Sequence, residues 1–120
     1  MVRILVLEDD LNLLEIFSDY LSGIGFHVTP LSEGAQFVPT VLQSSFDLLI
    51  CDLILPGFNF AKEINAIEKL KKPPGIIIMS GDFDEATKFV GQYRVLAKPF
   101  ELDTMKKTIH EALSRREQLL

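Results

Sequence analysis

Four short apolar stretches of this chain each end in side chains that can bind a cation or move a proton. These side chains are Glu8 and Asp9 after residues 4–7, Asp52 after 48–51, Ser80 after 76–79 and Lys98 after 94–97. An ionised carboxylate at the end of a buried strand needs a partner, because burying a bare charge is very costly. The central question is therefore what the Asp52 carboxylate is held against.

The stretch around Asp52 is the most apolar in the chain. Residues 48–57 read Leu-Leu-Ile-Cys-Asp-Leu-Ile-Leu-Pro-Gly, so a run of strand length stops at Asp52 and a Pro-Gly turn signal follows. Such a run is typical of a strand that is covered on both faces, as in a parallel sheet. Side chains alternate along a strand, so Cys51 points away from Asp52 and is predicted to be a core residue.

Strand-like runs alternate with helix-like stretches five times. We predict strands at 4–7, 27–31, 46–51, 76–79 and 94–97, with 27–31 at an edge because Pro30 lacks an amide hydrogen. The predicted helices carry inward stripes at Leu14, Phe17, Leu21 and Ile24; at Phe37, Val38, Val41 and Leu42; at Ala61, Ile64, Ile67 and Leu70; at Ala86, Phe89 and Val90; and at Leu102, Met105, Ile109, Ala112 and Leu113.

This alternation predicts an α/β fold with one five-stranded parallel sheet and helices on both faces. With the common strand order 2-1-3-4-5, the polar residues that end the strands share one rim. Glu8 and Asp9 then face Asp52 across the point where the strand order reverses, which is where ligands bind in open α/β sheets.

Three carboxylates at that rim repel one another. At roughly 6 Å and an effective dielectric constant near 20, each pair costs about 3 kcal/mol, so the acids must take up protons or hold a cation. Carboxylate oxygens with water suit Mg²⁺, which typically adds a phosphate oxygen to its ligands. With the Lys98 ammonium and the Ser80 hydroxyl close by, the set predicts a phosphoryl-transfer site in which Asp52 is the nucleophile.

Composition narrows the class of protein. The 120 residues are enough for one domain with a hydrophobic core, and the net charge of -5 argues against a nucleic-acid or membrane-surface binder. One cysteine allows no internal disulfide and favours the reducing cytoplasm. No apolar run approaches the roughly 18 residues of a membrane span, and the N-terminus does not have the layout of a signal peptide.

The motifs at the strand ends together resemble the receiver domain of two-component response regulators, over essentially the whole of residues 1–120. The matching segments are residues 4–10, 47–57, 77–81 and 96–100. The resemblance implies a flavodoxin-like three-layer fold and a cytoplasmic phosphoprotein that signals in a phosphorelay, rather than an enzyme that turns over a separate substrate.

The resemblance also assigns roles to individual residues. It implies that Asp52 is the phosphoacceptor, which takes a phosphoryl group from the phosphohistidine of a sensor histidine kinase or phosphotransfer protein. Asp9 and Asp52, the backbone carbonyl of Ile54 and, mostly through water, Glu8 would hold Mg²⁺. Ser80 and Lys98 would bind the phosphoryl oxygens.

Phosphorylation in this family repacks the face formed by the fourth helix, the fifth strand and the last helix, so the resemblance implies a switch there. It also leaves room for a homodimer through that face and for an output domain beyond residue 120. Two departures favour an alternative, a receiver-like binding module that does not switch and signals by constitutive contacts. Val95 stands where the family usually has an aromatic residue, and the segment from Ser80 to Lys98 is short, which should trim the fourth helix.

Two rival functions fit less well. Phosphatases of the haloacid dehalogenase type carry a second Asp two positions after the nucleophile, where this chain has Ile54. A dinucleotide-binding domain would need a glycine-rich turn after the first strand, but this turn is acidic and would repel a pyrophosphate.

The sequence leaves several local choices open. Asp10 or Asn12 starts the first helix, and Asp82 either caps the fourth helix or orients water at the site. Phe58 and Phe60 either cover the site or stay exposed beside it.

Overall fold

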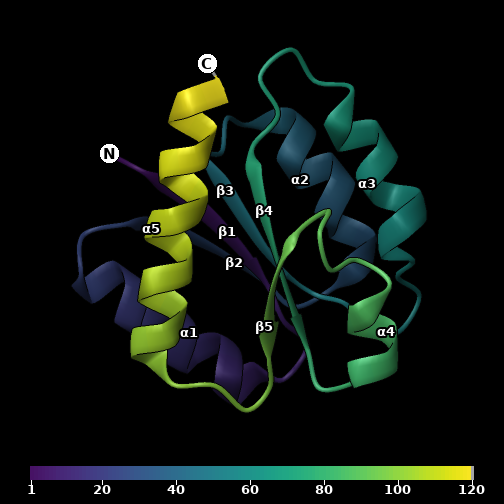
Figure 1. The fold of residues 1–120 in the computed structure, drawn as a ribbon, viewed down its shortest axis with the longest axis horizontal. Coiled ribbons are helices and arrows are strands. Elements are labelled where there is room, and N and C mark those ends of the chain that lie inside the picture. Colours follow the sequence, from purple (N-terminus) through teal and green to yellow (C-terminus); the bar gives the residue numbers. More distant parts are fainter. Residues whose placement is uncertain (120) are drawn as a thin grey trace.

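The computed structural model describes residues 1–119, which form a parallel five-stranded sheet in the order β2-β1-β3-β4-β5 (Figure 1). This confirms the predicted α/β fold and its strand order. The strands are β1 (Arg3–Leu7), β2 (His27–Leu31), β3 (Leu48–Asp52), β4 (Gly75–Ser80) and β5 (Arg94–Ala97), and the helices are α1 (Leu11–Gly23), α2 (Phe37–Gln43), α3 (Phe60–Glu68), α4 (Phe83–Thr87) and α5 (Leu102–Leu119).

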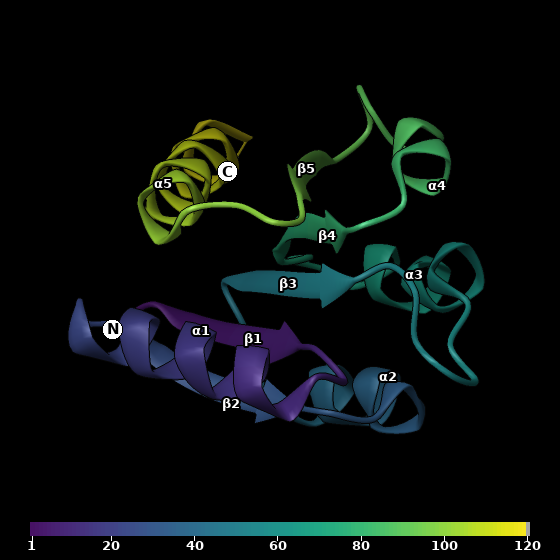
Figure 2. The ribbon, with the colours of Figure 1, turned by 90° about the horizontal axis from the view of Figure 1, so that it is seen from below.

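The sheet is buried on both faces. Helices α1 and α5 cover one face, and α2 and α3, with the short α4 beyond them, lie on the other (Figure 2). In β3, Leu48 and Ile50 point into the first layer and Leu49 and Cys51 into the second. This alternation explains why the central strand is apolar at every position before Asp52, and it confirms that Cys51 is a core residue.

Side-chain caps fix where three helices begin. The Asp10 carboxylate accepts hydrogen bonds from the amides of Asn12 (3.0 Å) and Leu13 (3.2 Å), so Asp10 caps α1. Asn59 caps α3 in the same way, and Asp82 caps α4 by accepting from the Glu85 amide at 3.1 Å. The sequence left open whether Asp10 or Asn12 caps the first helix and whether Asp82 caps the fourth. The structure shows that Asp10 and Asp82 are the caps.

One of the predicted inward positions of the second helix is wrong. A 3₁₀ turn (Gly34–Gln36) precedes α2, so Pro39 falls in the first helical turn, where its missing amide hydrogen costs little. Two turns of helix bury only Phe37 and Val41, which lie four residues apart on one side. Leu42 is rotated off that side and is 52% exposed.

The predicted burial of Ile24, Ala61 and Val90 is also wrong, and Ala61 is an exposed residue of α3. Ile24 lies just past the end of α1 and Val90 just past the end of α4, and both side chains are exposed, Val90 by 67%. Helix α4 has only five residues, as the short segment before Lys98 predicts. After it the chain turns at Gly91, whose φ of 92° is in the left-handed region that favours glycine.

An aromatic cluster holds the start of β5 against α3. The Phe60 ring is 3% exposed and meets the rings of Phe89 and Tyr93 edge-on, with centroids 5.2 and 5.5 Å away. The Tyr93 hydroxyl donates a hydrogen bond to the Glu68 carboxylate on α3. Phe58 in the β3–α3 loop is half-buried against Phe37. Phe58 and Phe60, the first residue of α3, therefore both pack inward rather than stand free beside Asp52.

Within the described chain, no helix combines the length and the apolar character that crossing a membrane requires.

Candidate functional site

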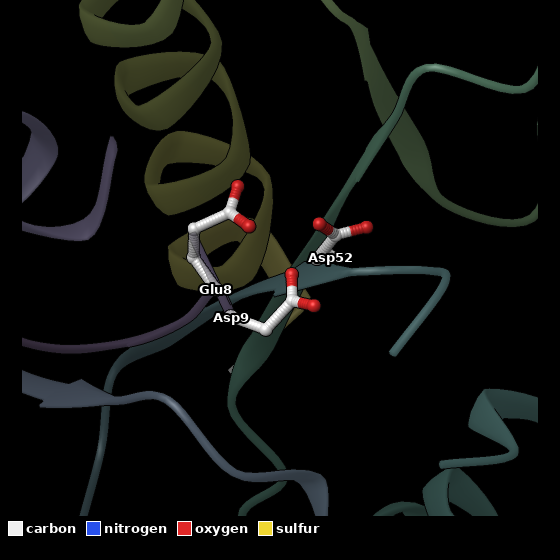
Figure 3. A group of neighbouring side chains, drawn as sticks. All are labelled: Glu8, Asp9 and Asp52. Carbon is white, nitrogen blue, oxygen red and sulfur yellow. The ribbon is translucent and has the colours of Figure 1, made fainter. Parts of the chain in front are cut away.

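Three carboxylates from two strand ends converge at the carboxyl edge of the sheet. Glu8 and Asp9 follow β1, and Asp52 ends the neighbouring strand β3 (Figure 3). One oxygen from each of the three lies within 4.8 Å of the others. Glu8 is 1% and Asp52 6% exposed, while Asp9 is exposed to solvent. Two of the three carboxylates are therefore buried and the third is at the surface.

Lys98 joins both buried acids. Its ammonium nitrogen Nζ lies 2.8 Å from Asp52 Oδ2 and also donates to Glu8 Oε1. Lys98 directly follows β5, and its amide donates to the Ser80 carbonyl at 2.8 Å, which ties it to the end of β4. The peptide bond between Lys98 and Pro99 is cis.

Charge at the site is unbalanced, because one ammonium faces three carboxylates. Burial raises the pKa of Glu8 to about 7, although hydrogen bonds from Lys98 and the Asp10 amide act in the opposite direction and the charge of Asp52 adds to the rise. For Lys98, burial alone would lower the pKa, but hydrogen bonds and charge from Asp52 and Glu8 outweigh it and raise the pKa. Negative charge is therefore in excess.

Backbone amides fix the orientation of both buried carboxylates. The Ile54 amide donates to Asp52 Oδ1 at 3.1 Å, and the Asp10 amide donates to Glu8 Oε2 at 3.2 Å. The Ile54 side chain itself is exposed. The β3–α3 loop therefore holds one oxygen of the Asp52 carboxylate through a backbone amide, and Lys98 holds the other oxygen.

Ser80 is buried at the end of β4, but its hydroxyl bonds to the loop that follows. Ser80 Oγ accepts from the Asp82 amide at 3.0 Å and donates to the Asp82 carbonyl at 3.1 Å. Because Asp82 caps α4, the Ser80 hydroxyl and the start of α4 share one small hydrogen-bonded turn.

The structure brings together the side chains of Glu8, Asp9, Asp52 and Lys98, which the sequence singled out at the strand ends. The Ser80 hydroxyl is bonded to the Asp82 backbone instead. Two contacts were not expected from the sequence: the direct bond between Lys98 and Glu8, and the Ile54 amide on Asp52. A lysine that shares a rim with buried acids is a signal that could have indicated the first. The second depends on the path of the β3–α3 loop, which residue types alone do not determine.

The carboxylates fit a hard divalent cation. Oxygen ligands within 4.8 Å of one another can reach a common ion, and Mg²⁺ prefers one or two carboxylates with water and phosphate oxygens. A divalent charge would also offset the excess negative charge of the three carboxylates.

Comparison with known proteins identifies the relatives of this chain. The model of the response regulator receiver domain family matches residues 4–110. The transcriptional regulatory protein GltR of Pseudomonas aeruginosa is 34% identical over 122 residues, which cover 96% of this chain and 50% of GltR. The response regulator ArlR of Staphylococcus haemolyticus is 30% identical, with 98% and 55% covered. The chain thus spans about half the length of these relatives.

Solved structures share the fold. A response regulator receiver domain protein of Clostridium thermocellum superposes with a TM-score of 0.87 at 23% identity and covers 100% of both chains. The response regulator TrrA of Thermotoga maritima, solved in complex with Mg²⁺-BeF, has a TM-score of 0.83 at 24% identity, with 94% of this chain and 100% of TrrA covered.

Proposed function

The chain belongs to the response regulator receiver domain family, and on that basis we propose that it is a phosphoacceptor signalling domain that is reversibly phosphorylated on Asp52. The phosphoryl donor is the phosphohistidine of a sensor histidine kinase or of a phosphotransfer protein. The domain acts as a signal carrier in the cytoplasm, and any output domain is a separate unit of the regulator.

One observation carries this proposal. A buried carboxylate, Asp52, has an ammonium group 2.8 Å from one of its oxygens and two further acids beside it, and all of them come from the carboxyl ends of parallel strands. A carboxylate that is only structural would need one cation. The two further acids, Glu8 and Asp9, leave negative charge in excess. Such an excess is expected where a metal ion binds together with a phosphoryl group.

The chemistry follows from the side chains. An oxygen of Asp52 attacks the phosphorus atom and forms an acyl phosphate, while the bond from phosphorus to the histidine nitrogen breaks and its electron pair stays on the imidazole. Lys98 balances negative charge on the phosphoryl oxygens from where it now touches Asp52. Hydrolysis later restores the carboxylate and releases inorganic phosphate.

Mg²⁺ is the cofactor we propose, held by Asp9, Asp52, the carbonyl of Ile54 and, through water, Glu8. When bound, it would neutralise charge on the transferring phosphoryl oxygens. TrrA, a member of the same fold, was solved with Mg²⁺-BeF, which supports this assignment.

Ser80 is proposed to bind a phosphoryl oxygen. To do so, its hydroxyl must give up the hydrogen bond to the Asp82 carbonyl. Because Asp82 caps α4, this movement would disturb the start of that helix and carry the signal to the face of α4, β5 and α5, through which a homodimer could also form.

Acetyl phosphate or beryllofluoride with Mg²⁺ tests the chemistry. We expect a one-to-one adduct by mass spectrometry that is lost with Asp52→Asn and with EDTA. Asp19→Asn, which removes an exposed carboxylate on α1, is the matched control and should leave the adduct intact. An adduct that survives Asp52→Asn would refute the assignment.

A second candidate is a receiver that binds partners without switching. Val95 in place of an aromatic residue and the five-residue α4 favour it. Amide chemical shifts with and without beryllofluoride separate the two. Shifts that spread over α4, β5 and α5 support switching, and shifts confined to the neighbours of Asp52 support the constitutive module.

A further inference from the structure

A groove of about 680 Å³ lies at the amino ends of β4 and β5, opposite the end of the sheet that carries Asp52. Its walls are the loop before β4, the start of β5 and the C-terminal part of α5. Figure 1 shows that loop and the end of α5 at the same end of the molecule. The proposed phosphoryl chemistry does not use this groove.

The groove is basic, although the chain as a whole is acidic. Four of the chain's 12 lysines and arginines line it, against one of its 17 acidic residues. The four are Lys71, Lys72, Arg94 and Arg115.

Most of this positive charge has no partner among the described residues. Glu68, the one acid of the lining, accepts the hydrogen bond of Tyr93, and Arg94 lies 3.6 Å from Glu111. Lys71, Lys72 and Arg115 are exposed, and the structure records no hydrogen bond or ion pair from their side chains to any residue that it describes. Three cations on one rim are thus free to attract an anion.

Beneath the basic rim the lining is apolar. Pro74 and Ala112 are buried, Ile76 is half-buried, and the Tyr93 side chain forms part of the wall. Apolar surface in a concave site is a favourable place for a bulky apolar side chain of a ligand. The groove therefore offers two kinds of contact, an apolar floor and a cationic rim.

We propose that this groove binds an acidic peptide segment of a partner protein, with an apolar side chain of the peptide on the floor and its carboxylates against Lys71, Lys72 and Arg115. The remaining surface selects against a long polyanion such as nucleic acid, because the net charge of -5 repels whatever extends beyond the groove. A small inorganic anion would leave the apolar floor uncovered.

A peptide with one phenylalanine between aspartates and glutamates is the probe. Titrated into the whole ¹⁵N-labelled chain, it should saturate below about 1 mM and shift the amides of Gly75, Ile76 and Tyr93 rather than those near Asp52. Replacing its phenylalanine with serine should weaken binding at least tenfold. Added salt should weaken it too, because exposed charges are screened.

Charge reversal in the protein gives the matched comparison. Lys71→Glu with Lys72→Glu should lower the affinity at least tenfold, and Arg115→Glu severalfold. Lys62→Glu with Lys106→Glu, two exposed lysines outside the groove, changes the net charge equally and should leave the affinity within twofold.

Three results would overturn the proposal: no saturable shifts, equal losses in both double variants, or inorganic phosphate binding as tightly as the peptide. Asp52 phosphorylation measured on the same variants keeps this test separate from that of the proposed function.

Discussion

At the scale of single residues, the cluster of Glu8, Asp52 and Lys98 places charges where they cost the fold stability, in keeping with the proposed ligand site. Glu8 is nearly inaccessible to water and shares its one cation with a second carboxylate. Buried charges that are incompletely paired destabilise the folded state. Such a loss of stability is expected at a site where a bound cation supplies the positive charge that the carboxylates lack.

The raised pKa of Glu8 predicts how stability depends on pH without Mg²⁺. The folded state holds the proton until about pH 7, whereas the ordinary value is 4.5. The unfolded state therefore loses its proton first, and the free energy of unfolding should fall by up to about 3 kcal/mol between pH 4.5 and 7. Urea unfolding in EDTA measures this. Glu8→Gln should lack this component and be more stable at pH 7. Parallel profiles for the two proteins would contradict the prediction.

Cys51 gives a second prediction at this scale. Burial raises the pKa of its thiol well above the usual range, and the nearby charge of Asp52 adds to the rise. Since the thiolate is the reactive form, the folded protein should react with iodoacetamide only through unfolding. Alkylation followed by mass spectrometry should therefore show protection in buffer and rapid labelling in guanidinium chloride. Rapid labelling of the native protein would show that the site opens.

At the scale of elements, the contacts around Phe60 position the segment between α4 and β5. This ring joins the start of α3 to Phe89 and Tyr93, and Phe83, 79% exposed on α4 itself, contributes nothing to that packing. Phe60 and Phe83 are both phenylalanines, on the consecutive helices α3 and α4. Substituting each by alanine therefore compares a buried ring with an exposed one.

Phe60→Ala should destabilise the protein by about 3–5 kcal/mol, because it leaves a cavity beside the rings of Phe89 and Tyr93. Phe83→Ala should change the free energy of unfolding by less than about 0.5 kcal/mol, because its ring is already in water. Chemical denaturation of both variants with Mg²⁺ absent checks this. Equal effects would mean that the cluster does not hold the segment in place.

The strands were easier to predict than the helix ends, for a physical reason. Strands such as β3 are buried on both faces, so their residues must be apolar at every position, and that pattern is visible in the sequence. The burial of Leu42 and Val90 depended on where short helices start and stop. For α2 a 3₁₀ turn decided this, and for α4 the cap of Asp82 and the turn at Gly91.

The sequence was enough to predict which residues form the candidate site, but not which hydrogen bonds join them. Parallel strands bring their carboxyl ends to one edge, so Glu8, Asp9 and Asp52 were expected to be neighbours once the strand order was known, with Lys98 on the same edge. Which carboxylate oxygen meets Lys98, and that Ser80 turns toward Asp82, depend on loop paths. The types of the residues do not determine the path that a loop takes.

At the scale of the whole molecule, a ligand at the acidic site should stabilise the entire fold. Mg²⁺ at 100 times its dissociation constant should add about 2.7 kcal/mol to the free energy of unfolding, if it binds only the folded state. Thermal unfolding with increasing MgCl₂ measures the gain. Asp9→Asn should remove most of it, since Asp9 belongs to the carboxylate group.

Asp10→Asn is the control for that experiment. Asparagine caps a helix as well as aspartate does, and Asp10 serves as a cap rather than as a member of the carboxylate group. This variant should therefore keep the gain in stability from MgCl₂. Equal losses in both variants would indicate a general effect of negative charge near α1.

The placement of acids at one end of the sheet and unpaired cations at the other has a consequence for how this molecule moves toward its partners. Opposite charges separated along the strands give it an electric dipole moment, although its net charge is negative. A charged protein approaching from solution exerts a torque on that dipole and turns the domain before the two surfaces touch. Productive collisions become more frequent, and dilute buffers should accelerate encounter far more than they strengthen the final complex.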